Sequence, residues 1–288
     1  MESNKIKLII NADDFGLTRS VNRAIFELTE IGTVTSTTVM TNMPYAEEAI
    51  ALLNNPRVSV GLHFNLTQGK PLSPVESVKT LVDENGVFFN NREFDRRIRA
   101  GLIKPAEIYQ ELQQQYKKLY KLIGNKISHL DSHQGLNRIP LVYSQIIKFG
   151  KLSNIKAIRF YVKYFASEAR GKPLIKKPSV FSISEFGLRR ILVETYLKVK
   201  LRKIRTYYYS PDGIVMAKNY STLSLLKWFV ENGRKLNYSH KRIFEIPCHP
   251  ACDRSELYDT KYVQERIDEY ELLKSSEFCA LTENISFV

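Results

Sequence analysis

The sequence contains no apolar run close to the roughly 20 residues that a membrane-spanning helix needs. Its first residues, MESNKIKLIINADD, lack the long apolar stretch and cleavage site of a secretory signal peptide, so we expect a cytoplasmic protein. Three cysteines among 288 residues are an odd number and do not indicate a disulfide scaffold. Neither GxGxxG nor a P-loop motif occurs, so nothing points to a dinucleotide or P-loop site.

Positive charge is abundant but unevenly distributed. The net charge is +13, and residues 151–205 hold fifteen Lys and Arg against three Glu, a net of +12. Residues 186–205, FGLRRILVETYLKVKLRKIR, interleave apolar side chains with seven basic ones. This segment could be a solvated amphipathic helix, or it could bind an anionic membrane or another anionic polymer. Nucleic acid is not expected, because no recognised binding motif accompanies the charge.

Short apolar runs alternate with helical patterns along the whole chain. Apolar side chains make up 43% of the sequence, enough for a real core. The strands are expected at residues 5–10, 34–40, 58–64, 127–131, 157–162, 242–248 and 284–288. The helices are expected at residues 18–31, 46–53, 105–123, 141–149, 186–204, 222–232 and 262–274. We expect Thr18 to cap the first helix and Gly32 to end it. Residues 70–100 are expected to be irregular, and residues 163–185 to form a loop or insertion.

Alternation of strand and helix predicts βα units and a mostly parallel sheet. About seven such units favour an α/β fold of the TIM-barrel type with an irregular barrel. We expect a single domain over residues 1–288, with a basic helical or inserted segment at about 163–205.

Four of the five histidines lie where predicted strands end. His63 lies in VGLHFNLT, His129 and His133 lie in ISHLDSH, and His249 closes IFEIPCHP. Catalytic groups of α/β barrels gather at the C-terminal ends of the strands. Any one of these histidines could be an ordinary core residue, but their recurrence indicates a shared site.

Two adjacent carboxylates, Asp13 and Asp14, follow the first predicted strand. One aspartate and two histidines are a suitable ligand set for a divalent metal, and the second aspartate could then take a proton from water. Successive strand residues point to opposite faces, so both carboxylates can serve one site only if the chain turns there. We expect Phe15 and Gly16 to supply that turn. The alternative is that Asp14 caps the following helix.

These motifs resemble the YdjC family, the ChbG/HpnK-type carbohydrate deacetylases. The resemblance lies in NADDFGLTRSVNRAI, GTVTSTTVMTNMP, VGLHFNLTQGKPLSP, HLDSHQ, AIRF and EIPCHPA, which follow one another in family order along essentially the whole chain. It implies an irregular (β/α) barrel that hydrolyses an N-acetyl group from an amino sugar such as N-acetylglucosamine, with a metal-bound water attacking the acetamide.

The resemblance also implies a role for each strand-end residue. Asp14, His63 and His133 would bind the metal, Asp13 would be the general base, and His249 would protonate the departing amine. The family is usually described with Mg²⁺, but this ligand set would also suit Zn²⁺. The implied partner is an N-acetylated carbohydrate, and a homodimer is expected from the resemblance alone.

The roles of four other residues are open. Arg159 could contact the sugar, hold Asp13 in its charged form or be an ordinary surface arginine. Asn65 is a candidate substrate contact. His129 is expected in the core or beside a ligand, and Asp131 could hold a ligand histidine in place.

The chain departs from the family after the motif DSH. Many relatives continue with histidines in the form HxHxH, whereas here Gly135 and Asn137 occupy those positions. This change could alter the sugar contacts or abolish activity. The alternative function is therefore a protein that binds an anionic membrane or polymer through residues 151–205, with reduced or no catalysis. Both features together would suit a glycolipid or lipid-linked sugar, met at the inner face of a membrane.

Overall fold

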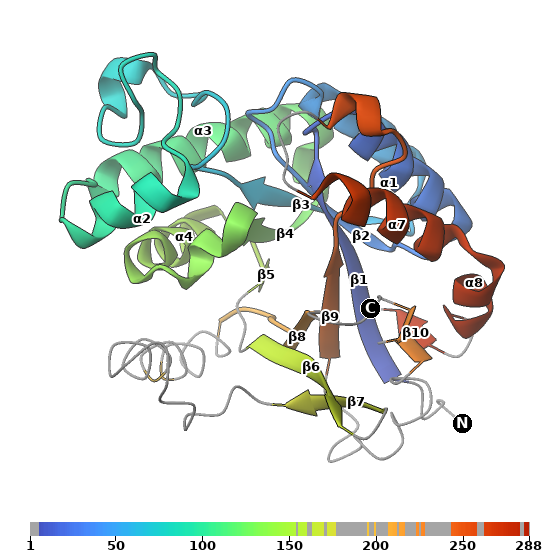
Figure 1. Ribbon diagram of the computed structural model, residues 1–288. Coiled ribbons are helices and arrows are strands. Elements are labelled where there is room, and N and C mark those ends of the chain that lie inside the picture. Colours follow the sequence, from blue (N-terminus) through green and yellow to red (C-terminus); the bar gives the residue numbers. More distant parts are fainter. Residues whose placement is uncertain are drawn as a thin grey trace.

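The computed structural model (Figure 1) describes most of the chain, and all strands that carry the candidate site are in the described part. The described residues are 6–153, 155–159, 163–169, 172–176, 195, 199, 207–211, 213–216, 223–224, 226–227, 243–257, 262–282 and 285–287.

A curled, mostly parallel sheet forms the centre of the structure (Figure 1). Its strands are β1 (Ile6–Phe15), β2 (Ser36–Val39), β3 (Ser59–Phe64), β4 (Ile127–Ser132), β5 (Ala157–Ile158), β6 (Lys163–Ala169), β7 (Lys172–Lys176), β8 (Gly213–Met216), β9 (Ile243–Cys248) and β10 (Ile285–Phe287). The order is β5-β4-β3-β2-β1-β9-β8-β6-β7, with β10 pairing beside the start of β1. Among these pairs, β6 and β7 are antiparallel and the others are parallel.

The β5 edge of this sheet approaches the chain segment that leads into β8. An isolated parallel bridge joins Ala157 of β5 to Tyr209, in the chain that leads into β8. The sheet therefore curls back on itself, and the predicted α/β fold with an irregular TIM-like barrel is confirmed.

The two faces of the sheet differ in polarity. On β1, Leu8 and Ile10 are fully buried in the apolar core, which fills the space between the sheet and the helices. The opposite face carries polar side chains that bond to one another: Asn11 Nδ2 donates to Thr38 Oγ1 (3.2 Å), and Thr38 Oγ1 donates to Asp131 Oδ2 (3.0 Å). The inside of the curled sheet is therefore a buried polar layer.

Helices surround the sheet, with α3 and α4 on one side in Figure 1 and α1 and α7 on the other. The α-helices are α1 (Arg19–Ile31), α2 (Asn91–Arg99), α3 (Pro105–Ile123), α4 (Pro140–Ser153), α7 (Val263–Lys274) and α8 (Ser276–Thr282). The 3-10 helices are η1 (Ala46–Asn54), η2 (Val75–Ser77), η3 (Gly124–Lys126), η4 (His133–Arg138) and η5 (Arg254–Glu256). No described helix is both long and apolar enough to cross a membrane.

Helix α1 begins and ends where its capping residues predict. The Thr18 side chain accepts a hydrogen bond from the backbone N–H of Val21 at 3.2 Å. Gly32 adopts the left-handed conformation at φ 89° and donates its backbone N–H to the Leu28 carbonyl. These are the usual signals of a helix start and stop, and both predictions are confirmed.

Two predictions of secondary structure are wrong. Residues 91–99 form α2 instead of an irregular segment, and residues 163–169 and 172–176 form the antiparallel strands β6 and β7 instead of a loop. The helix expected at residues 46–53 is present as a 3-10 helix over residues 46–54. Helix α2 escapes a search for apolar periodicity because Phe94 is its one buried residue. It is stabilised instead by the Asn90 cap and by ion pairs of Glu93 with Arg96 and Arg97.

The basic helix predicted at 186–204 lies almost entirely outside the described residues, as do residues 177–185 and most of the helix predicted at 222–232. The role of the basic segment and the single-domain organisation therefore stay predictions.

Candidate metal centre and active site

Five strands bring the predicted site residues to one edge of the sheet. Each residue lies at the C-terminal end of its strand or directly after it: Asp13 and Asp14 on β1, His63 on β3, His133 after β4, Arg159 after β5 and His249 after β9. Because these strands are parallel neighbours, residues that are far apart in sequence meet at this edge.

Asp14 itself makes the turn that places two adjacent carboxylates in one site. It has a left-handed backbone at φ 70°, and the pairing of β1 with β2 shifts register between Ala12 and Phe15. An irregularity of this kind re-aims a side chain within a strand. The expected turn at Phe15 and Gly16 is also present, because the Leu17 N–H donates to the Asp14 carbonyl at 3.1 Å and Gly16 has φ 97°. The alternative that Asp14 caps α1 is wrong, because Thr18 is the cap.

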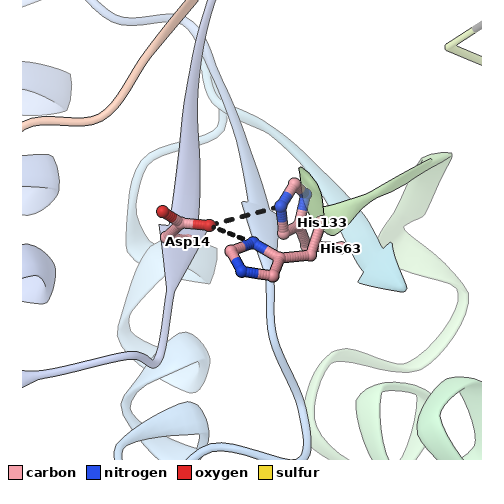
Figure 2. A group of neighbouring side chains, drawn as sticks. All are labelled: Asp14, His63 and His133. Carbon is pink, nitrogen blue, oxygen red and sulfur yellow. Dashed lines mark hydrogen bonds and ion pairs between the residues drawn. The ribbon is translucent and has the colours of Figure 1, made fainter. Parts of the chain in front are cut away.

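Asp14, His63 and His133 form a compact buried group (Figure 2). Asp14 Oδ1 lies 2.9 Å from His133 Nδ1 and 3.3 Å from His63 Nε2. One potential ligand atom from each of the three residues lies within 4.8 Å of the other two. Asp14 and His63 are each 1% exposed, so little water competes at these atoms.

His63 is held from behind by Asp131, as expected. Its Nδ1 lies 2.6 Å from Asp131 Oδ1 and 3.1 Å from Thr38 Oγ1. An Nδ1–H that donates to a carboxylate fixes the ring and leaves Nε2 free to bind a metal. Burial would lower the pKa of His63, but Asp131 and Asp14 outweigh it and raise this pKa to about 10.

The donor set fits a divalent cation. Burial would raise the pKa of Asp14, but Arg266 and His133 hold it well below its usual range, so the carboxylate is ionised. His133 Nε2 is a buried nitrogen with no hydrogen-bond partner among the described residues, which a ligand would satisfy. One carboxylate and two imidazoles are ligands that Zn²⁺ and other divalent first-row ions accept. The identity of the ion does not follow from these atoms.

Asp13 binds an arginine instead of the imidazole pair. Arg159 Nη1 and Nη2 donate to Asp13 Oδ2 and Oδ1 at 2.8 and 2.7 Å. Nη1 also lies 2.7 Å from Asp131 Oδ2, and Nη2 lies 2.5 Å from Glu245 Oε1. Arg159 is 7% exposed, so it is not a surface arginine. Of the roles left open, this arrangement supports holding Asp13.

Burial and charge act in opposite directions on these carboxyl groups. Burial would raise the pKa of Asp13, but Arg159 outweighs it and holds this pKa well below its usual range. Burial dominates at Glu245 and, against the attraction of Arg159, raises its pKa to about 7. Asp13 is therefore ionised throughout the neutral range.

His249 is the accessible member of the site. Its side chain is 39% exposed, and its Nε2 lies 3.8 Å from Asp13 Oδ2. The residue is held through its backbone, because its N–H donates to Glu269 Oε2 at 2.8 Å and its carbonyl accepts from Arg266 Nη1 at 3.4 Å. The imidazole can therefore be reached from solvent, whereas Asp13 beside it is buried.

Asn65 is bonded within the loop that follows β3. It is fully buried, and its Nδ2 donates to the Gln68 carbonyl and to Asn42 Oδ1. Its Oδ1 accepts the backbone N–H groups of Thr67 and Gln68. The side chain therefore supports the loop after β3, and its contact with a substrate stays a prediction.

Asn137 is also directed into the protein. It is 2% exposed, and its Nδ2 donates to the Arg159 carbonyl at 2.6 Å. The residue that replaces a family histidine thus supports the segment that carries Arg159. The neighbouring Gly135 has φ 68°, a conformation that glycine adopts at little cost.

Two further residues of the site were not predicted. Glu245 could have been noticed, because it is a lone carboxylate in the apolar run IFEIP. Arg266 of α7, whose Nη2 binds Asp14 Oδ2, gave no such signal, because it is one of many charges on a polar helix.

Comparison with known proteins identifies the family of the chain. The family model described as YdjC-like protein matches residues 7–284. A relative from Enterococcus faecalis (strain ATCC 700802 / V583), named carbohydrate deacetylase, is 32% identical over 280 residues, 96% of this chain and 92% of the relative.

Two other relatives match over a shorter segment. The carbohydrate deacetylase of Thermoanaerobacter pseudethanolicus is 44% identical over 149 residues, and the chitooligosaccharide deacetylase of Serratia marcescens is 38% identical over 149 residues. Each alignment covers 51% of this chain. The alignments cover 58% of the Thermoanaerobacter protein and 57% of the Serratia protein. This chain thus matches little more than half the length of these two proteins.

A solved structure shows the same fold. It is a protein of Enterococcus faecalis V583 that carries the provisional name of a cellobiose-phosphate cleavage protein. The two structures align with a TM-score of 0.73 and 26% sequence identity, and the alignment covers 99% of this chain and 97% of the other. With the family model matched along nearly its whole length, the chain belongs to the YdjC-like family.

Proposed function

We propose that the protein is a metal-dependent carbohydrate deacetylase, which hydrolyses the N-acetyl group of an amino sugar. The observation that carries the proposal is the buried group of Asp14, His63 and His133 with Asp13 directly beside it. The names of the relatives, carbohydrate deacetylase and chitooligosaccharide deacetylase, support the substrate class.

Hydrolysis of an acetamide consumes one water and yields acetate and an amine. One proton must leave the attacking water, and one must reach the amine nitrogen. A divalent cation held by Asp14, His63 and His133 would supply Lewis acidity, which polarises a carbonyl and lowers the pKa of water.

Asp13 would accept the proton of the attacking water. Arg159 keeps this carboxylate ionised and in a fixed orientation through two hydrogen bonds. A carboxylate with such a low pKa is a weak base. The positive charge of Arg159 is shared, because Arg159 pairs with Asp131 and Glu245 as well as with Asp13. The usefulness of Asp13 as a base would therefore depend more on its fixed position beside the attacking water than on its intrinsic basicity.

His249 would give a proton to the departing amine. Its exposed imidazole faces the same space as Asp13, with 3.8 Å between Nε2 and Oδ2. The two groups could thus act on one substrate, the aspartate as base and the histidine as acid. Anionic membrane binding through residues 151–205, location in the cytoplasm and dimer formation stay predictions from the sequence.

The test is acetate release from N-acetylated chitooligosaccharides with Mg²⁺, Mn²⁺, Zn²⁺ or Co²⁺. Asp13→Asn should lower kcat by about 10²–10⁴-fold, the usual contribution of a general base, while metal binding persists. Asp14→Asn should abolish metal binding as well. Asp95→Asn, in an exposed carboxylate on α2, is the control and should act like the wild type. Unchanged activity in both site variants would refute the assignment.

A further inference from the structure

We propose that Arg266 of α7 is a positioning residue for the metal centre: it binds one oxygen of Asp14 and so keeps the other turned toward His63 and His133. This inference rests on the proposed function, because it assumes that Asp14, His63 and His133 bind a cation.

The two oxygens of Asp14 have separate partners. Oδ1 faces the imidazoles, at 2.9 Å from His133 Nδ1 and 3.3 Å from His63 Nε2. Oδ2 accepts from Arg266 Nη2. Asp14 therefore offers one oxygen to a cation, while its second oxygen is occupied.

The strand is irregular where it carries Asp14. Asp14 lies in a left-handed conformation at the irregular end of β1, where the pairing with β2 shifts register. Among the described residues, Arg266 is the lysine or arginine that pairs with Asp14. The guanidinium thus supplies a directional constraint that the strand end lacks.

Arg266 is well anchored for such a role. It is 5% exposed, and its backbone carbonyl accepts the Ala251 N–H at 3.2 Å. Its Nη1 donates to the His249 carbonyl at 3.4 Å. One side chain therefore connects the proposed metal ligand with the segment that carries the proposed acid.

Attraction of the cation cannot explain a buried arginine here. A guanidinium beside a ligand carboxylate repels a metal ion and weakens its binding. A role in charge alone predicts that Arg266→Gln binds metal more tightly. A role in positioning predicts the opposite, because a freed carboxylate rotates away from the imidazoles.

The experiment is calorimetric titration of the full chain with Mn²⁺. Arg266→Gln should bind about 10–100-fold more weakly, the usual effect of losing a group that orients a metal ligand. Arg266→Lys keeps the positive charge but loses the planar guanidinium group. Its affinity for Mn²⁺ should lie between that of the wild type and that of Arg266→Gln. The electron paramagnetic resonance spectrum of bound Mn²⁺ should also differ between Arg266→Gln and the wild type. Acetate release by Arg266→Gln should recover partly as Mn²⁺ is raised.

Tyr270→Phe is the matched control. Tyr270 is also buried on α7, and its hydroxyl pairs with Glu27 at a distance from the metal group. This variant should lose thermal stability while it keeps Mn²⁺ affinity.

If Arg266→Gln binds Mn²⁺ as tightly as the wild type or more tightly, the inference is overturned. If Arg266→Gln does not fold, a wild-type Mn²⁺ affinity in Arg266→Lys would overturn it. If the wild type binds neither Mn²⁺, Zn²⁺ nor Co²⁺, the proposed metal centre itself fails, which is a distinct outcome.

Discussion

Three buried carboxylates share the guanidinium of Arg159. Asp13, Asp131 and Glu245 all lie within 2.8 Å of its Nη atoms, so not all can be fully compensated by one positive charge. At Glu245 burial dominates and raises the pKa to about 7. Asp13 and Glu245 thus pair with the same guanidinium, but the pKa of Asp13 is lowered and that of Glu245 is raised.

Glu245 should make the stability of the metal-free protein depend on pH. Its carboxyl binds a proton more tightly in the folded chain than in the unfolded chain, where its pKa is near 4.5. The corresponding stability is fully present below about pH 4.5 and is lost as pH rises through about 7. Relative to Glu245→Gln, the wild type should therefore lose about 1–3 kcal/mol between pH 4.5 and 8.

Urea unfolding with EDTA at both pH values measures this difference, because titrations common to the two proteins cancel. A difference between the wild type and Glu245→Gln that does not change with pH would contradict the prediction.

Helix α3 supports the loop that follows β3. Its buried polar residues recur every fourth position: Glu107 accepts from Thr80, Glu111 from the N–H groups of Leu72 and Ser73, and Gln115 exchanges two hydrogen bonds with the Asn65 backbone. Since Asn65 lies two residues after His63, this helix face also fixes the end of β3.

Glu111→Gln should destabilise the protein by about 1–3 kcal/mol, because the NH₂ group that replaces one oxygen cannot accept from the backbone N–H that bonds to this oxygen. Gln113→Ala, at an exposed position of the same helix, should change stability by less than about 0.5 kcal/mol. Urea unfolding of the two variants compares them directly, and equal effects would show that α3 does not hold the loop through this carboxylate.

Strands β3 and β4 meet closely at Gly61 and His129. A Cβ added at Gly61 would lie 2.6 Å from His129 Nε2, so the half-buried histidine packs across the glycine. Gly61→Ala should cost about 1–3 kcal/mol through overpacking.

The double variant Gly61→Ala/His129→Ala tests the cause of that cost. If the clash is responsible, the alanine at 61 should cost much less when His129 is absent, as a double-mutant cycle measures. Additive effects would place the cost of Gly61→Ala elsewhere in β3.

At the scale of the whole molecule, the site joins distant parts of the chain. Asp14 and His133 are 119 residues apart in sequence, and their contact depends on the parallel order of β1, β2, β3 and β4. A cation bound to these residues therefore stabilises the folded barrel against the unfolded chain, where the ligands are dispersed.

Mn²⁺ at about 100 times its Kd should add about 2.7 kcal/mol to the stability of the wild type, which corresponds to a rise in Tm of roughly 5–10 °C. Asp14→Asn should remove this rise. A thermal scan with and without Mn²⁺ measures both, and an equal rise in the variant would place the bound ion at another site.

The sequence determined the features that depend on local pattern. The apolar runs predicted most strands, and Thr18 and Gly32 predicted the ends of α1, because capping involves residues within one turn. The recurrence of Asp and His after strands predicted which residues meet, because the carboxyl ends of parallel strands share one edge. The family motifs added the roles that remain proposals.

Only the tertiary structure decided the partners of the charged side chains. Arg266 is an ordinary basic residue in the sequence, and the sequence left three roles open for Arg159, yet each is buried against one of the adjacent aspartates. The left-handed backbone of Asp14 and the loop-bound side chain of Asn65 were equally hidden. A charge pattern gives the sign of an interaction, whereas the register and curl of the sheet select which opposite charge comes within reach.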